Sequence, residues 1–271
     1  TWSFTLLPIN RYIYIKNIKY LLNKFSSIND KYFSFQEKIN LCIKNFDREG
    51  KLIKDSRNTV KVFRIDDLYI NIKRFKRPNF INRLVYSFFR STKACRSFLY
   101  ANKLLDYNIL TPDPIAYIEN SKYYLLDDSF YVCKNIDYDF DMKHVFENKE
   151  LEQRDKLIKK FVLFTHKLHE NGIMFLDHST SNTIIKKIEG DYKLFLIDLN
   201  RMNFKKMNFE DRLINFRRLN LSDDSIKKVS HFYSEIVNVN KDLIFEKIKK
   251  YSQNFQINRR KRKKIKNIFK N

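Results

Sequence analysis

A long helix followed by a loop and a β-hairpin is the feature that most constrains the fold of this sequence. Apolar residues recur three and four apart over residues 151–170, which predicts a helix with one buried face. Asn171 and Gly172 mark its end, because glycine adopts the left-handed conformation that helix ends favour. A polar loop follows, and residues 183–188 and 192–198 then read as the two arms of a hairpin.

The half of the chain before this helix has a different character. Residues 51–75 predict successive strands, because β-branched and aromatic residues alternate with polar ones there. Ala94, Phe98 and Ala101 share one face of a predicted helix over 91–105, and two more strands follow it. Helical patterns fill the chain after the hairpin. We therefore predict an α+β, two-lobed fold of the protein-kinase-like kind, with a small antiparallel β lobe carrying one helix and a larger helical lobe.

The composition divides the chain further. The expected parts are an N-terminal extension of mixed helix and loop (1–50), the small lobe (51–130), the helical lobe (131–255) and a basic C-terminal tail (256–271). Eight basic residues and no acidic one lie between Arg259 and Lys270. The whole chain carries a formal net charge of +23. Such a charge favours polyanionic partners: nucleic acid, an anionic membrane face or phosphorylated substrates.

Several classes of protein lack support in the sequence. The chain has no helix-turn-helix, RNP or zinc-finger pattern, so only its charge points to nucleic acid. Cys42, Cys95 and Cys133 are odd in number and have no CxxC spacing, which favours free thiols in a reducing compartment. No run reaches the roughly 18 apolar residues of a membrane span. We expect a cytoplasmic protein.

Four residues match the needs of phosphoryl transfer in type and order. The chemistry needs a cation for the phosphates, oxygen ligands for Mg²⁺ and a carboxylate near the attacking hydroxyl. Lys73 lies on a predicted strand, Asp177 and Asn182 are five apart in the loop, and Asp198 ends the hairpin. The helix, loop and hairpin around the last three make the pattern far more specific than the spacing alone.

Each residue then has an expected role. Asp177 would orient or deprotonate the acceptor hydroxyl, and Asn182 with Asp198 would hold Mg²⁺. Lys73 would pair with the α- and β-phosphates as a point charge. In the alternative interpretation, Asp177 is an ordinary loop acid, Asn182 a turn residue and Asp198 a cap at a strand end.

At these residues the sequence resembles the lipopolysaccharide kinase (Kdo/WaaP-like) family of bacteria, especially its Bacteroidetes-type members. The matching stretches, which lie in order between about residues 55 and 205, are Phe75–Asn82, Lys93–Ala101, Thr111–Glu119, Leu168–Ile173 and Leu196–Met202. The resemblance implies a two-lobed kinase fold, ATP with Mg²⁺ as cofactors, and a Kdo or heptose hydroxyl of lipid A–core as the acceptor. The basic tail would hold such an enzyme at the inner face of the inner membrane as a peripheral protein.

The resemblance suggests roles for further residues. The phosphates would meet backbone amides of the polar turn at Ser56, Arg57 and Asn58. The adenine would meet the backbone near Asp128 and Phe130, where a kinase hinge would lie. His178, next to Asp177, would contact phosphate on the substrate. Arg201 would either steady the catalytic loop or meet phosphate on the acceptor. An ordinary solvated bend at 127–130 and a surface salt bridge at Arg201 are the alternatives.

Two departures from the kinase pattern support another function. The helix over 91–105 contains no Glu to hold Lys73, and no glycine-rich loop covers the phosphates. The alternative is a catalytically inactive kinase fold that binds anionic core lipid or a partner protein. If the protein is an active sugar kinase, the basic tail would bind an anionic membrane surface. The alternative is that the tail is an ordinary solvated end.

Overall fold

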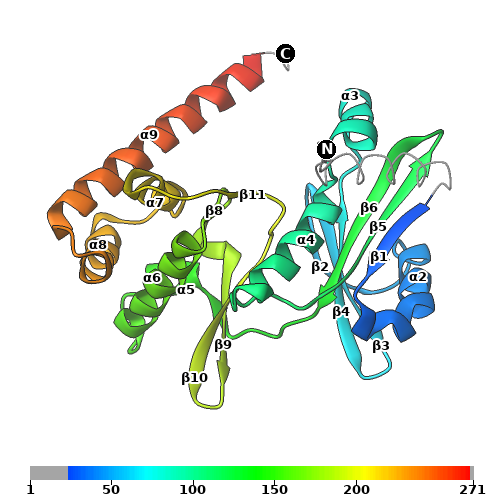
Figure 1. Cartoon of the computed structure of the whole chain (residues 1–271), viewed down its shortest axis with the longest axis horizontal. Coiled ribbons are helices and arrows are strands. Elements are labelled where there is room, and N and C mark those ends of the chain that lie inside the picture. The colour runs from blue at the N-terminus through cyan, green and yellow to red at the C-terminus, as the bar shows by residue number, and fades with distance from the viewer. Residues whose placement is uncertain (1–23, 269–271) are drawn as a thin grey trace, which may run out of the picture. The chain divides into compact units, whose positions relative to one another are not determined.

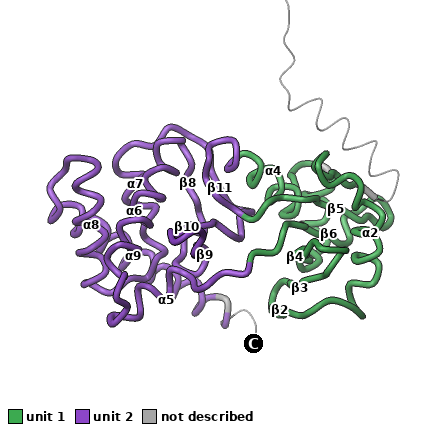
Figure 2. Tube along the Cα trace, turned by 90° about the horizontal axis from the view of Figure 1, so that it is seen from below, with its two compact units in different colours: residues 1–103, 112–136 green, residues 104–111, 137–271 purple. Residues whose placement is uncertain are grey.

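The chain forms two compact units in a computed structural model that describes residues 24–268 (Figure 1, Figure 2). Unit 1 takes residues up to Lys103 and Pro112–Ile136, and unit 2 takes Leu104–Thr111 and everything from Asp137 onward. The boundary falls after residue 136, not at the expected 130/131, because the last strand of unit 1 continues through Lys134.

Unit 1 is built on a six-stranded antiparallel sheet with the order β1-β5-β6-β4-β3-β2. Its strands are β1 (Lys24–Ile28), β2 (Lys51–Asp55), β3 (Asn58–Ile65), β4 (Leu68–Phe75), β5 (Pro114–Lys122) and β6 (Leu125–Lys134). The predicted strands and the predicted helix over 91–105, seen here as α4 (Lys93–Asp106), are confirmed with small shifts of their ends.

The two faces of this sheet are covered by different helices. Side chains alternate between the faces of a strand, so Ile70 and Ile72 of β4 share one face. They form a core with Ile39 and Cys42 of α2 (Gln36–Lys44). Helix α4 meets the opposite face, where the rings of Phe98 and Tyr117 lie 5.4 Å apart.

Residues 24–50 belong to unit 1 and are more ordered than the expected mixture of helix and loop. Strand β1 pairs with β5 at the edge of the sheet, and a 3₁₀ turn, η1 (Asp30–Phe35), leads into α2. Phe46, just after α2, packs edge-on against Phe130. Residues 1–23 lie outside the described part of the chain.

A short helical insertion joins β4 to α4. It consists of α3 (Phe80–Leu84) and a π-helical turn, η2 (Val85–Phe89). Asn79 caps α3, since its side chain accepts a hydrogen bond from the backbone N–H of Asn82.

Unit 2 is mainly helical, as predicted, around the helix α6 (Arg154–Glu170). The expected hairpin is β9 (Thr183–Ile188) and β10 (Asp191–Leu196). The remaining elements are β7 (Phe140–Asp141), α5 (Met142–Glu147), β8 (Ile173–Phe175), η3 (Thr180–Asn182), β11 (Met202–Phe204), α7 (Phe209–Asn215), η4 (Phe216–Arg218), α8 (Asp223–Val237) and α9 (Lys241–Ile268).

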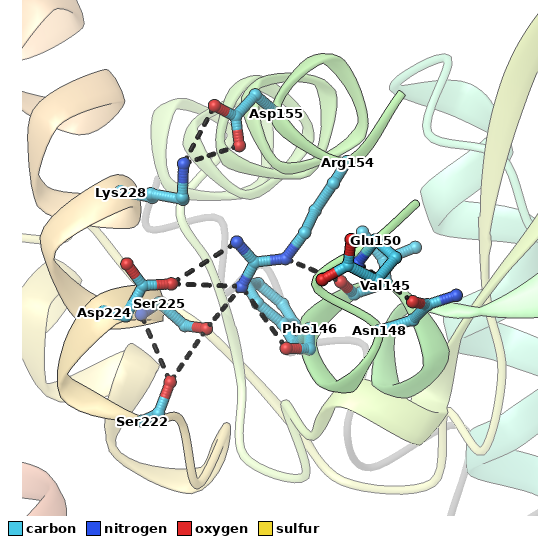
Figure 3. A network of polar contacts seen from close by, with 10 residues as sticks. All are labelled: Val145, Phe146, Asn148, Glu150, Arg154, Asp155, Ser222, Asp224, Ser225 and Lys228. Carbon is cyan, nitrogen blue, oxygen red and sulfur yellow. Dashed lines mark hydrogen bonds and ion pairs between the residues drawn. The ribbon is translucent and has the colours of Figure 1, made fainter. Parts of the chain in front are cut away.

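A buried arginine ties three of these helices together (Figure 3). Arg154, at the start of α6, donates to the carbonyls of Val145 and Phe146 at the end of α5. Its guanidinium also reaches Asp224 and Ser225 in the first turn of α8. Because these groups satisfy the buried cation, the network fixes where α5 and α8 pack on α6.

The expected basic tail is the end of a helix. Helix α9 continues through Arg259–Lys264 to Ile268, and Arg and Lys are good helix formers. Their side chains are exposed as far as Lys264. Within residues 24–268, every helix is either too short or too polar to cross a membrane.

Candidate active site

The β9–β10 hairpin brings two of the predicted residues together. Leu196 pairs with Thr183 at the open end of the hairpin, so Asn182 and Asp198 lie just beyond the last pair. The backbone N–H of Ile197 donates to the carbonyl of Asn182 at 3.0 Å. The two candidate metal ligands are therefore neighbours at one end of the hairpin, although 16 positions separate them in the sequence.

Asp177 joins this pair through Asn182. The side-chain amide of Asn182 donates to the backbone carbonyl of Asp177 at 2.8 Å. This bond uses the nitrogen of the Asn182 amide, so its Oδ1 oxygen is the atom that can serve as a ligand. The structure thus places Asp177, Asn182 and Asp198 in one cluster of unit 2.

Two arginines hold the Asp177 carboxylate. Arg201 lies 3.1 Å from its Oδ1 oxygen, and Arg218 donates to the same oxygen. Arg218 also donates to the carbonyl of Leu176 at 2.9 Å. The side chain of Asp177 is 16% exposed, whereas that of Arg201 is 53% exposed. Both contacts use Oδ1, so Oδ2 is the oxygen that can face an acceptor.

Short strands place Arg201 beside Asp177. Strand β11 pairs with β8, and the N–H of Leu176 donates to the carbonyl of Arg201. Gly172 permits this pairing: its φ is +65°, and a Cβ at this position would lie 2.7 Å from the carbonyl oxygen of Lys205. Only glycine fits so close an approach at that backbone angle.

Asp198 adopts an unusual backbone conformation. Its φ is +59°, in the left-handed region that costs most residues on the order of 1 kcal/mol. Asn200, which is buried, donates its amide to the Asp198 Oδ1 oxygen at 2.6 Å. Backbone strain of this kind concentrates at functional sites, where surrounding contacts hold the residue in place.

His178 lies in the core of unit 2. It is fully buried and stacks on Phe161, and its Nε2 atom lies 3.2 Å from the Thr165 hydroxyl. Burial lowers the pKa of His178 to about 3, so the ring is neutral at neutral pH. A neutral ring shielded from solvent cannot serve an acceptor phosphate, and we correct that expectation for His178.

A second buried histidine supports the strand before Asp177. His169 lies 3.0 Å from the Tyr233 hydroxyl and 3.3 Å from Oδ1 of Asn215. Asn215 then donates to the carbonyl of Phe175, the last residue of β8. Burial lowers the pKa of His169 to about 3. Local sequence patterns do not reveal Asn215 and Arg218, because both lie about 40 residues beyond the loop that they support.

Lys73 lies in unit 1, on the sheet face that α4 covers. It pairs with Tyr131 of β6, which pairs in turn with Tyr117 of β5. Burial raises the pKa of the nearby Cys133 thiol to about 12, and the positive charge of Lys73 opposes that rise. Lys73 Nζ lies 5.2 Å from the centroid of the Phe75 ring.

The predicted phosphate turn borders a basic hollow on the same face. Ser56 and Arg57 lie between β2 and β3, and Asn58 accepts a hydrogen bond from the N–H of Lys76. The hollow has a volume of about 270 Å³. Its cationic lining residues are Arg57, Lys76, Arg77 and Lys93.

Asp128 and Phe130 do not lie where the sequence analysis placed them. Both belong to the interior of β6, and the chain leaves unit 1 only after Ile136. Phe130 is buried in the core beneath α2. Burial, followed by the charge of Asp127, raises the pKa of Asp128. We therefore correct the hinge assignment of Asp128 and Phe130, because the strand runs further than its turn-like residues indicated.

Glu119 is a buried carboxylate that the sequence analysis did not single out. It lies on β5, two residues from Tyr117, and therefore on the same sheet face as Lys73. It is 2% exposed, and the Thr92 hydroxyl at the start of α4 donates to it at 2.6 Å. The face that carries Lys73 thus has a buried acid on a strand, although the helix supplies none.

The cluster in unit 2 fits a metal that arrives with a nucleotide. Within residues 24–268, no group of three or more His, Cys, Asp or Glu side chains is gathered as a metal site. Mg²⁺ bound to phosphates commonly takes only one or two protein carboxylates, with phosphate oxygens and water completing its shell. The carboxylate of Asp198 and the amide oxygen of Asn182 match that need.

The antiparallel sheet of unit 1 and the helices of unit 2 define a protein-kinase-like fold. The sequence model of the "Lipopolysaccharide kinase (Kdo/WaaP) family" matches residues 56–238. The chain therefore belongs to this family of kinases, which act on the lipopolysaccharide core. None of the curated proteins compared with the chain matches it.

One solved structure supports the fold. The chain is similar to WaaP, solved "in complex with acyl carrier protein", with a TM-score of 0.58 and 14% identity over 84% of this chain and 98% of that one. A double mutant of the Mycobacterium tuberculosis PknI kinase domain gives a TM-score of 0.42 and 11% identity over 68% of this chain and 73% of that one. The second likeness is too weak to carry an argument.

Proposed function

We propose that this kinase transfers the γ-phosphoryl group of ATP to a hydroxyl of a Kdo or heptose residue in the lipopolysaccharide inner core. Family membership supports the core as acceptor. The observation that carries the proposed chemistry is the clustering of Asp177, Asn182 and Asp198 at the open end of one hairpin.

Asp177 is the residue that meets the acceptor hydroxyl. Arg201 and Arg218 hold its Oδ1 oxygen and leave Oδ2 to accept the hydroxyl proton. Since both contacts are to charged donors, they are stronger than neutral hydrogen bonds and restrict the carboxylate to one orientation. Arg201 is half exposed and can also meet a negative charge on the acceptor.

Asn182 and Asp198 are the proposed Mg²⁺ ligands. Their oxygen atoms suit a hard cation, and the Ile197–Asn182 backbone bond keeps the two residues adjacent. Asn200 orients the Asp198 carboxylate through its Oδ1 oxygen. The metal, when bound, supplies charge neutralisation for the transferred phosphoryl group.

Unit 1 supplies positive charge for the nucleotide phosphates. Lys73 acts as the point charge, and the turn at Ser56–Asn58 with its basic hollow acts as the phosphate cradle in place of a glycine-rich loop. We further propose that Glu119 provides the negative charge that the helix lacks, because it lies on the Lys73 face and is buried. Glu119 would then take the place of the Glu that α4 lacks.

Thermal denaturation with and without ATP and Mg²⁺ tests the nucleotide site. Ligand at 100 times its dissociation constant stabilises the folded state by about 2.7 kcal/mol. For a chain of this size that is a rise in Tm of roughly 5–10 °C. We expect a rise that requires Mg²⁺, that Asp198→Asn abolishes and that Glu119→Gln reduces.

Asp191→Asn is the matched control. Asp191 starts β10 at the other end of the hairpin and pairs with Lys160 and Lys193 on the surface, so its variant should respond to ATP as the wild type does. If saturating ATP and Mg²⁺ leave the wild-type Tm unchanged, the catalytically inactive alternative is the better description. If the Tm of Glu119→Gln rises with ATP and Mg²⁺ as much as that of the wild type, Glu119 is not part of the nucleotide site. The proposed roles of the other residues would not be affected.

A further inference from the structure

One end of unit 1 carries an unusual group of exposed apolar side chains. We call it the apolar tip. It comprises Phe80 (64% exposed), Ile81 (70%), Leu84 (36%) and Phe89 (82%) from the α3–η2 insertion, with Tyr123 (80%) and Tyr124 (57%) from the β5–β6 turn. Scattered exposed apolar residues are normal, but a contiguous group of large ones marks an interaction surface.

Hydrogen bonds fix the two parts of the apolar tip side by side. The Arg83 guanidinium in α3 donates to the carbonyl of Leu126 at 2.6 Å. The N–H of Leu126 donates in turn to the hydroxyl of Ser87 in η2 at 2.9 Å. Leu126 follows the turn at Tyr123 and Tyr124 by two residues, and Figure 1 shows α3 beside β6. The insertion is therefore held against the start of β6.

The insertion and its flanking residues carry charge of one sign. Residues 76–93 contain five basic residues and no acidic one: Lys76, Arg77, Arg83, Arg90 and Lys93. Lys122 precedes the two tyrosines and lies over the Tyr123 ring at 5.6 Å. The nearest acid in sequence, Asp127, pairs with Arg77 at 2.6 Å. The result is an apolar centre with a basic rim, in which Lys76, Arg77 and Lys93 also line the basic hollow.

We propose that the apolar tip inserts into the interfacial region of an anionic lipid bilayer. Phe and Ile side chains gain by leaving water for the acyl boundary, and Tyr favours the headgroup level because one end of its ring is polar. The basic rim matches anionic headgroups. Helix α3 has five residues, so it lies in the interface and does not cross the bilayer.

Two other occupants match the tip less well. A second copy of the chain would bring two basic rims together, and like charges oppose such a contact. Nucleic acid would match the rim but would leave the exposed Phe and Ile side chains without an apolar partner. A bilayer surface, which is anionic at the headgroups and apolar beneath them, satisfies both halves of the tip. The inference does not depend on phosphoryl transfer, so vesicles without nucleotide test it separately.

Co-sedimentation with vesicles of phosphatidylglycerol mixed with phosphatidylcholine tests the proposal. We expect the variant carrying Phe80→Ser, Ile81→Ser and Phe89→Ser to bind at least about tenfold more weakly than the wild type, a loss of about 1.4 kcal/mol or more. The matched control carries Leu52→Ser and Ile53→Ser on β2. These side chains are 54% and 55% exposed in the same unit, and their replacement should leave binding unchanged.

Tryptophan fluorescence locates the contact directly. In a Trp2→Phe background, Phe89→Trp and Leu52→Trp each leave a single tryptophan. Vesicles should shift the emission of the Phe89→Trp protein to shorter wavelength and leave that of the Leu52→Trp protein unchanged. Wild-type binding by the triple Ser variant, or emission at position 89 that vesicles do not shift, would overturn the proposal. So would wild-type self-association without lipid that the triple variant abolishes, since a second copy would then occupy the tip.

Discussion

Arg218 donates a hydrogen bond to the Oδ1 oxygen of Asp177, although 41 positions separate the two residues. The guanidinium of Arg218 also lies 5.3 Å from the ring centroid of Phe255 in α9. The last helix of the chain therefore helps to position the proposed catalytic carboxylate. This contact links the C-terminal part of unit 2 to the loop that carries Asp177.

Replacement of Arg218 should lower turnover more than nucleotide affinity. We expect Arg218→Met to reduce kcat roughly 10- to 100-fold with little change in the KM for ATP, because the variant loosens Asp177 and leaves the phosphate-binding residues intact. Arg218→Lys should recover part of the loss, since it keeps the charge but not the fork of donors. Steady-state kinetics at varied ATP separates kcat from KM.

Arg217 provides the comparison for that experiment. It is the neighbour of Arg218 and also lies near Phe255, but its guanidinium donates to the carbonyl of Ile214. Arg217→Met should therefore keep kcat close to that of the wild type. Equal losses in the Arg217 and Arg218 variants would show that η4 matters only for packing.

Gly172 should be far less tolerant of substitution than Gly190. Both glycines have positive φ, so alanine at either position incurs a backbone cost of roughly 1–2 kcal/mol. At Gly172 the new methyl group would also meet the Lys205 carbonyl at 2.7 Å, whereas nothing lies within 4 Å at Gly190. Denaturant unfolding should show a clearly larger loss for Gly172→Ala. Equal losses would mean that the β8–β11 pairing does not depend on this close approach.

Folding stability should fall as the pH drops below about 6.5. His169 and His178 have folded pKa values of about 3, against an ordinary value of 6.5, so only the unfolded chain binds their protons between these limits. The stability is fully present above pH 6.5 and is lost progressively toward pH 3. At pH 5 the loss is roughly 2 kcal/mol for each histidine.

His178→Leu should remove about half of that histidine-dependent loss between pH 7.5 and pH 5. Leucine has a similar volume, and the comparison uses the change with pH, so a constant packing effect cancels. His231→Leu is the control for the exchange of a histidine for leucine, because His231 is exposed on α8. Identical pH dependence in the wild type and the His178 variant would show that His178 does not titrate as its burial requires.

Local patterns predicted the elements that build the proposed site. The helix before Asp177, the hairpin and the positions of Asn182 and Asp198 follow from apolar periodicity and from Gly172, because these signals act over a few residues. Arg218 and Asn215 could not be found this way, since tertiary packing alone brings them to the loop.

The secondary structure expected from the sequence was wrong where polar residues suggested a turn or a solvated end. The acidic pair at 127–128 indicated a bend, yet β6 continues through it because Phe130 and Val132 are buried against the α2 side of the sheet. Residues 24–28 gave no strand pattern of their own and become a strand by pairing with β5. The basic tail is helical to Ile268, in line with the helix propensity of Arg and Lys.

The most direct test of the proposed chemistry is phosphate transfer from ATP to isolated lipid A–core, followed by mass spectrometry of the product. We expect Mg²⁺-dependent addition of one phosphate to a Kdo or heptose by the wild type and by Asp191→Asn. Asp177→Asn should reduce the rate roughly 100- to 10,000-fold, the usual contribution of a positioned general base. Transfer by Asp177→Asn at the wild-type rate would contradict the proposed role of Asp177. No transfer by a wild-type protein that binds ATP and Mg²⁺ would contradict the proposed sugar kinase activity.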